Sequence, residues 1–135
     1  MINFIVKELE KLGYYNAKKI MEMCGKACAE FGDLGLAKKI AEETDDIDRI
    51  IARVNDEIAW CGKWNREECT ITAVCTECGC PLVKRGIVEI NATFCLCSKG
   101  WVKAVFEALL ERPVRVELEK AIGRGDDICK YNVNY

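Results

Sequence analysis

The chain has 135 residues, half of them apolar, and its 20 basic and 22 acidic residues leave a formal net charge of −2. Proteins that bind nucleic acid or a membrane surface through charge carry a clear basic excess, so this balance argues against both classes of partner. No apolar stretch approaches the roughly 18 residues of a membrane-spanning helix, and charged residues interrupt the N-terminal segment too early for a secretory signal. We therefore expect a cytoplasmic protein with a single domain over residues 1–135.

The chain contains ten cysteines and no histidine. Without histidine it cannot form a Cys–His or Ser–His nucleophile pair, nor a metal site that mixes cysteine with histidine. Any metal would therefore be held mainly by sulfur. Because no export signal is recognisable, bound metal or reduced thiols are the expected state of these cysteines, rather than a disulfide framework.

Residues 1–62 are predicted to be helical, because apolar residues recur there at helical spacing. The predicted segments run from Ile2 to Leu12, from Ala17 to Phe31, from Leu34 to Glu43 and from Ile47 to Ile58. Gly13 ends the first segment, and Thr44 or Asp45 is the expected N-cap of the fourth.

Residues 63–135 are predicted to add strands, because the apolar period changes there to two. The predicted strands are Cys69–Cys75, an extended stretch over Val83–Ile90 and Thr93–Cys97, Val114–Leu118 and Cys129–Val133, with a helix from Lys99 to Glu111 capped by Ser98. The expected fold class is α+β, with N-terminal helices packed on a small antiparallel sheet in the order α-α-α-α-β-β-α-β-β.

Five cysteines lie close together in the second part of the chain, at Cys75, Cys78, Cys80, Cys95 and Cys97. Two such groups can meet from opposite ends of a hairpin, and four thiolates around one ion are the ligand set of a structural zinc site. An iron–sulfur cluster is the alternative, although the spacing matches neither of the common ferredoxin patterns. We expect four of these five sulfurs to bind zinc at once.

Cys24 and Cys28 are spaced so that both sulfurs lie on one face of a helix, where they are possible further ligands or two small apolar residues of a packed stripe. The intervening Gly25 weakens a helix, which indicates close backbone approach or a helix end. Cys61 and Cys69 bracket a polar turn and are expected to pair with nothing, or to oxidise reversibly. Cys129 is expected to be a core residue.

The C-terminal half resembles a group of small cysteine-rich bacterial and archaeal proteins of unknown function. The resemblance covers about Cys75 to Val133 and rests on Cys80-Pro81, Cys95-Leu-Cys97-Ser98-Lys-Gly100-Trp101, Phe106-Glu107, Arg112-Pro113-Val114 and Gly125-Asp126-Asp127-Ile-Cys129-Lys-Tyr131. Cys24-Gly-x-x-Cys28 is also similar to that group. These proteins in turn resemble the 4-vinyl-reductase domain and the L-2-amino-thiazoline-4-carboxylic acid hydrolase-like proteins, which end in a similar hairpin with Phe where this chain has Tyr131.

This resemblance implies the fold of haem-NO-binding and TRAPP-subunit-like domains, which often dimerise, bind small or apolar ligands and in several cases carry a cysteine-bound metal. It transfers no activity, because fold does not determine function. We expect a non-catalytic zinc-binding domain that senses a small molecule or redox state and forms a homodimer. The alternative is an enzyme: an iron–sulfur redox protein, or a metal-dependent hydrolase with Glu77 as its base.

Overall fold

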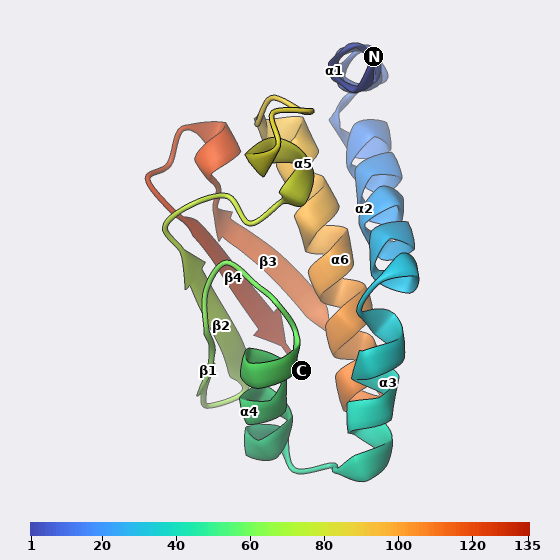
Figure 1. The fold of residues 1–135 in the computed structure, drawn as a ribbon. Coiled ribbons are helices and arrows are strands. Elements are labelled where there is room, and N and C mark those ends of the chain that lie inside the picture. Colours follow the sequence, from blue (N-terminus) through green and yellow to red (C-terminus); the bar gives the residue numbers. More distant parts are fainter.

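The computed structural model describes residues 1–135 and has six α-helices and one four-stranded antiparallel sheet, so the predicted α+β class is confirmed (Figure 1). The helices are α1 (Ile2–Glu10), α2 (Tyr14–Phe31), α3 (Leu34–Glu43), α4 (Ile47–Glu57), α5 (Pro81–Lys84) and α6 (Ala92–Leu110). The strands are β1 (Trp64–Glu67), β2 (Thr70–Cys75), β3 (Arg115–Lys120) and β4 (Cys129–Asn134), and a 3₁₀ turn, η1 (Ile122–Arg124), precedes β4. No helix combines the length and apolar character needed to cross a membrane.

The strand order in the sheet is β1-β2-β4-β3, and every neighbouring pair is antiparallel. Helix α6 runs along one face of the sheet, and α2 packs on the far side of α6 (Figure 1). Inward-facing residues alternate along β4, where Cys129, Tyr131 and Val133 are buried. These side chains and those of α6 form the main core, so α6 is the central element of the molecule.

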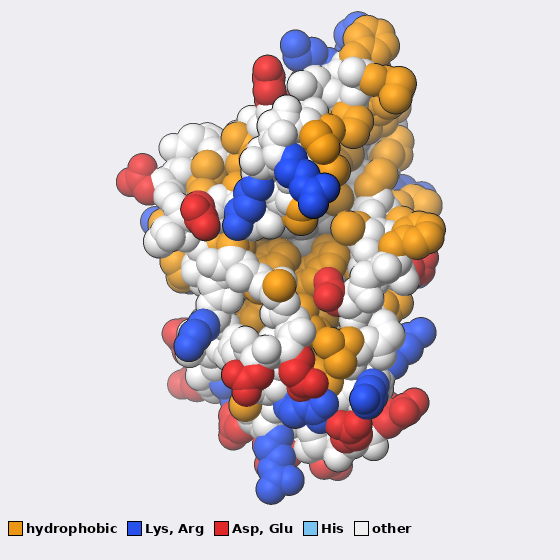
Figure 2. Space-filling view, in the orientation of Figure 1, with side chains coloured by type: hydrophobic (Ala, Val, Ile, Leu, Met, Phe, Trp, Pro, Cys, Tyr) orange, Lys and Arg blue, Asp and Glu red, His pale blue; other side chains and the backbone are white.

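The four N-terminal helices lie where the apolar periodicity predicts them. Helix α4 begins at Ile47 as predicted, but its N-cap is Asp46 rather than Thr44 or Asp45, and the Asp46 side chain accepts a hydrogen bond from the Arg49 N–H at 3.0 Å. Exposed apolar side chains, among them Phe4 and Phe31, follow α1 and α2, and apolar atoms gather over these helices in Figure 2.

The predicted extended stretch over residues 83–97 is wrong, because this segment contains helix α5 and the start of α6. Helix α6 begins after Asn91, whose side chain accepts a hydrogen bond from the Phe94 N–H at 2.8 Å. Ser98 does not cap the helix as predicted. Its hydroxyl donates to the Cys95 carbonyl inside the helix at 2.7 Å. The first turns of α6 are apolar on several sides because both α2 and η1 pack against them, and this hides the helical period.

Strand β1 was not predicted, because only its first residue is buried and the segment lacks apolar alternation. Trp64 anchors this edge strand in the core, and Asn55 of α4 holds it by two hydrogen bonds to the Trp64 backbone, at 2.8 and 2.9 Å. The tight turn into β2 uses Glu68 at a φ of 55°. The predicted two strands before the main helix thus exist, but they are β1 and β2.

Candidate functional site

Seven of the eight free cysteines gather around the N-terminal half of α6. They form two adjoining groups, and the charge of Cys80 in the first also acts on Cys78 in the second. The outer thiol group is Cys24, Cys28, Cys80 and Cys97, and the inner thiol group is Cys78, Cys95 and Cys129. Cys69 lies apart, exposed in the turn between β1 and β2.

Helices α2 and α6 touch backbone to backbone beside the outer thiol group. A Cβ added at Gly25 of α2 would lie 1.9 Å from the Cys97 carbonyl oxygen, and one added at Gly100 of α6 would lie 2.0 Å from the Glu22 carbonyl oxygen. No side chain fits at either position, so the two glycines set the distance between the helices. The close approach expected from Gly25 is confirmed, and it brings Cys24 and Cys28 beside Cys97.

The outer thiol group combines two exposed sulfurs with two partly buried ones. Burial, together with the neighbouring charges of Cys24, Cys28 and Cys80, raises the pKa of the Cys97 thiol to about 12. Burial also raises the pKa of Cys28, with Cys80 as its second cause. Cys97 and Cys28 therefore lie close enough to neighbouring thiols from α2 and the loop before α5 for those charges to oppose their ionisation.

Backbone amides point at the sulfurs of the inner thiol group. The Cys129 sulfur accepts a hydrogen bond from the Ile122 N–H at 3.4 Å. Burial raises the pKa of Cys95 to about 11, while a hydrogen bond from the Gly123 backbone opposes the shift. Burial raises the pKa of Cys78 in the same way, and the Cys80 backbone opposes it. Amide donors of this kind stabilise thiolates, but burial outweighs them at Cys95 and Cys78, so the pKa of both thiols stays raised.

Cys129 is buried, as predicted, but its membership of the inner thiol group was missed. The prediction rested on its alternation with Tyr131 and Val133, which identifies an inward-facing residue and does not show what faces it across the core. One available signal was its place in the Gly-Asp-x-x-Cys hairpin that carries the family resemblance. In the structure η1 folds that hairpin back on α6, and Gly123 contacts the Cys95 sulfur.

Cys61 and Cys75 form a disulfide with a Cα–Cα separation of 5.2 Å, which corrects two predictions. Cys61 was expected to remain unpaired, and Cys75 was expected to be a metal ligand. In the structure Cys75 has no free thiol, and its side chain is fully buried at the end of β2. Spacing alone could not reveal the pair, because the bond depends on how the loop from α4 to β1 lies against β2.

The free thiols lie near one another but are not arranged as the ligands of a metal ion. Nowhere in the structure do three or more Cys, Asp or Glu side chains stand in an arrangement that could hold one metal ion. Glu77, the base considered for a hydrolase, is exposed and lies 3.7 Å from the ammonium group of Lys84. Both outer and inner groups offer soft sulfur donors, which suit zinc or an iron–sulfur cluster by chemistry. Rotation of side chains would be needed to bring four sulfurs to one ion.

Comparison with known families matches residues 2–134 to the family model of DUF6144, a family of unknown function. Among functionally curated proteins, none matches the chain. The match spans both the helical part and the cysteine-rich part, so it includes all ten cysteines and every element that positions the two thiol groups. This protein therefore belongs to DUF6144, a family of unknown function.

Proposed function

We propose that this protein binds zinc through the outer thiol group, Cys24, Cys28, Cys80 and Cys97, and acts as a metal-dependent sensor of redox state or of a small molecule. The observation that carries the proposal is the backbone contact of α2 with α6 at Gly25 and Gly100. This contact holds the two α2 thiols against Cys97, and Cys80 adds a fourth sulfur from a third segment of the chain.

Four thiolates are the ligand set that zinc prefers in closed tetrahedral sites, with Zn–S distances of about 2.3 Å. The raised pKa of Cys97 means that the metal-free protein holds this thiol protonated at neutral pH, so zinc binding would release protons. The bound ion would tie α2 and α6 to the loop before α5. Much of the binding free energy would then appear as folding stability.

The proposed sensing of redox state rests on the solvent exposure of two of the four proposed zinc ligands. Cys24 and Cys28 are exposed, so an oxidant can reach two of the four ligands without unfolding the chain. Oxidation of these two would release the ion and free α2 from the loop before α5. The similarity to the 4-vinyl-reductase domain and to the hydrolase-like proteins belongs to this proposal as an analogy of fold, and the homodimer that it implies is tested by measuring the mass of the protein in solution.

The test is metal analysis of protein purified without oxygen, with zinc and iron counted per chain. We expect about one zinc in the unaltered protein, and loss of that zinc with a lower melting temperature in Cys80→Ser and Cys97→Ser. Cys69→Ser is the matched control, because Cys69 is a free thiol outside both groups.

Three outcomes would contradict the proposal. Zinc retained by Cys97→Ser but lost by Cys78→Ser would assign the ion to the inner thiol group. Several irons with equivalent sulfide would make the protein an iron–sulfur protein. A folded protein with neither metal would remove the metal function altogether.

A further inference from the structure

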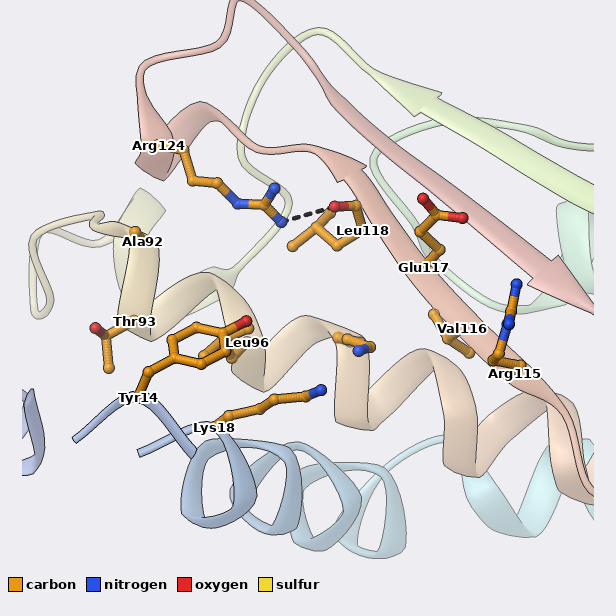
Figure 3. A pocket seen from close by; sticks show the side chains of 11 residues that line it. Tyr14, Lys18, Ala92, Thr93, Leu96, Arg115, Val116, Glu117, Leu118 and Arg124 are labelled. Atoms are coloured by element: carbon orange, nitrogen blue, oxygen red, sulfur yellow. Dashed lines mark hydrogen bonds between the residues drawn. The ribbon is translucent and has the colours of Figure 1, made fainter. Parts of the chain in front are cut away.

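A cavity of about 690 Å³ lies between α2, α6, η1 and the edge strand β3 (Figure 3). No cysteine lines it, so it is separate from both thiol groups. Its apolar lining is formed by Tyr14, Ala92, Leu96, Val116 and Leu118. Leu96, Val116 and Leu118 show only the edges of largely buried side chains there. Tyr14 of α2 lines the cavity near the start of α6, where its ring is drawn beside Thr93 and Leu96 (Figure 3). Cavities of this volume accommodate small organic ligands.

Positive charge is concentrated around this cavity, in contrast to the net charge of −2 of the whole chain. Four of the lining residues are cationic and one is acidic. Arg115 and Glu117 point from β3 to the side away from α6 (Figure 3). Lys99 is paired with Glu22 at 3.2 Å. Lys18 and Arg124 remain without an acidic partner among the hydrogen bonds and ion pairs of the structure.

The two unpaired cations differ in how firmly they are held. Arg124 donates a hydrogen bond from Nη2 to the Leu118 carbonyl oxygen at 2.7 Å, which fixes the guanidinium at the wall of the cavity and leaves its other N–H donors free. Lys18 is half-buried on α2, and its side chain extends along the cavity in Figure 3. A fixed guanidinium and a flexible ammonium beside an apolar surface are suited to an acid group attached to an apolar body.

We propose that this cavity binds a small organic anion, with the acid group between Lys18 and Arg124 and the apolar part against Leu96 and Val116. The inference does not depend on metal binding. It does place a ligand beside both thiol groups, because Leu96 lies between Cys95 and Cys97, and Arg124 follows the Gly123 that contacts the Cys95 sulfur. Binding of an anion could therefore be transmitted to the thiols through these two neighbours.

The experiment is isothermal titration of the full chain with octanoate, octyl phosphate and the uncharged octanol. We expect at least one of the two anions to bind, and octanol to bind at least tenfold more weakly than that anion. Shortening the chain of the anion that binds, from eight carbons to six, should weaken binding by roughly fourfold for each methylene that the cavity buries.

Lys18→Glu tests the charge, and Lys19→Glu is its matched control, because Lys19 is the next residue of α2, is exposed and does not line the cavity. We expect Lys18→Glu to weaken anion binding at least tenfold and Lys19→Glu to change it less than twofold. Binding of octanoate alone or of octyl phosphate alone supports the proposal and identifies the acid group. Failure of both anions, equal binding of octanol, or equal loss in the two lysine variants would overturn it.

Discussion

Cys75 and Cys129 lie directly opposite each other on the antiparallel strands β2 and β4, and both side chains face the core. Cys75 is bonded to Cys61, whereas Cys129 is a free thiol that accepts the Ile122 N–H. Two cysteines at one register position of the sheet thus have different chemistry. The disulfide and the inner thiol group are therefore neighbours across the β2–β4 strand pair.

The disulfide closes a short loop between α4 and β2, with a sequence separation of 14. Closing a loop of about 15 residues removes about 3 kcal/mol of conformational entropy from the unfolded chain. We predict that the double variant Cys61→Ala/Cys75→Ala loses about 3 kcal/mol of unfolding free energy in urea, and that reduction of the unaltered protein has a similar effect. Cys69→Ser should leave the stability unchanged. A stability insensitive to reductant would show that the bond is absent in solution.

The contact between α2 and α6 makes Gly25 and Gly100 intolerant of any side chain. Gly25→Ala gains roughly 1 kcal/mol of helix propensity but forces a Cβ into backbone atoms that cannot move aside. We predict a net loss of about 2 kcal/mol in unfolding free energy, measured by urea denaturation, together with reduced zinc content.

Gly35→Ala is the matched control for this substitution. Gly35 also lies in a helix, and nothing stands within 4 Å of the position its Cβ would take. This variant should be up to about 1 kcal/mol more stable than the unaltered protein. Equal effects of the two substitutions would show that α2 and α6 are not in backbone contact.

The ionisation of Tyr131 makes the unfolding free energy depend on pH in the alkaline range. Burial raises its pKa above the ordinary value of 10, although the hydrogen bond with Ser98, in which the Tyr131 hydroxyl donates to the Ser98 hydroxyl oxygen at 2.8 Å, opposes the shift. Above pH 10 the unfolded chain loses this proton while the folded chain keeps it, so the stability contribution is full below pH 10 and falls as pH rises further.

We predict that Tyr131→Phe flattens the loss of unfolding free energy between pH 10 and 11, measured by urea titration. The exposed Tyr14 supplies the control, because Tyr14→Phe should leave the slope as it is. An unchanged slope in Tyr131→Phe would mean that its phenol ionises equally in both states.

Asn91 fixes the start of α6, and with it the orientation of Cys95 and Cys97. Replacing an N-cap asparagine by alanine typically costs about 1 kcal/mol. We predict this loss for Asn91→Ala in urea denaturation, and a similar loss for Asp46→Ala at the cap of α4. If Asn91→Ala had no effect, the helix would begin later, as its sequence first suggested.

The periodic parts of the fold could be predicted from the sequence. Helices α1 to α4 and strands β3 and β4 each bury one face, and a one-sided pattern of apolar residues records that directly. The start of α6 could not be predicted in this way. Phe94, Cys95 and Leu96 are consecutive and all buried, because partners pack on different sides of the helix there.

For the cysteines, too, some properties follow from the sequence and others depend on tertiary packing. The sequence by itself determined that sulfur is the only soft donor available and that histidine chemistry is excluded, and it left Gly25 as either a close backbone contact or a helix end. Only the tertiary structure decided which cysteines are neighbours. It bonds Cys75 to Cys61, places the free thiol of Cys129 near that of Cys95, and places the α2 thiols near Cys97. The physical reason is range, because spacing along the chain reports contacts within a helix or turn, whereas these neighbours meet through the packing of elements far apart in sequence.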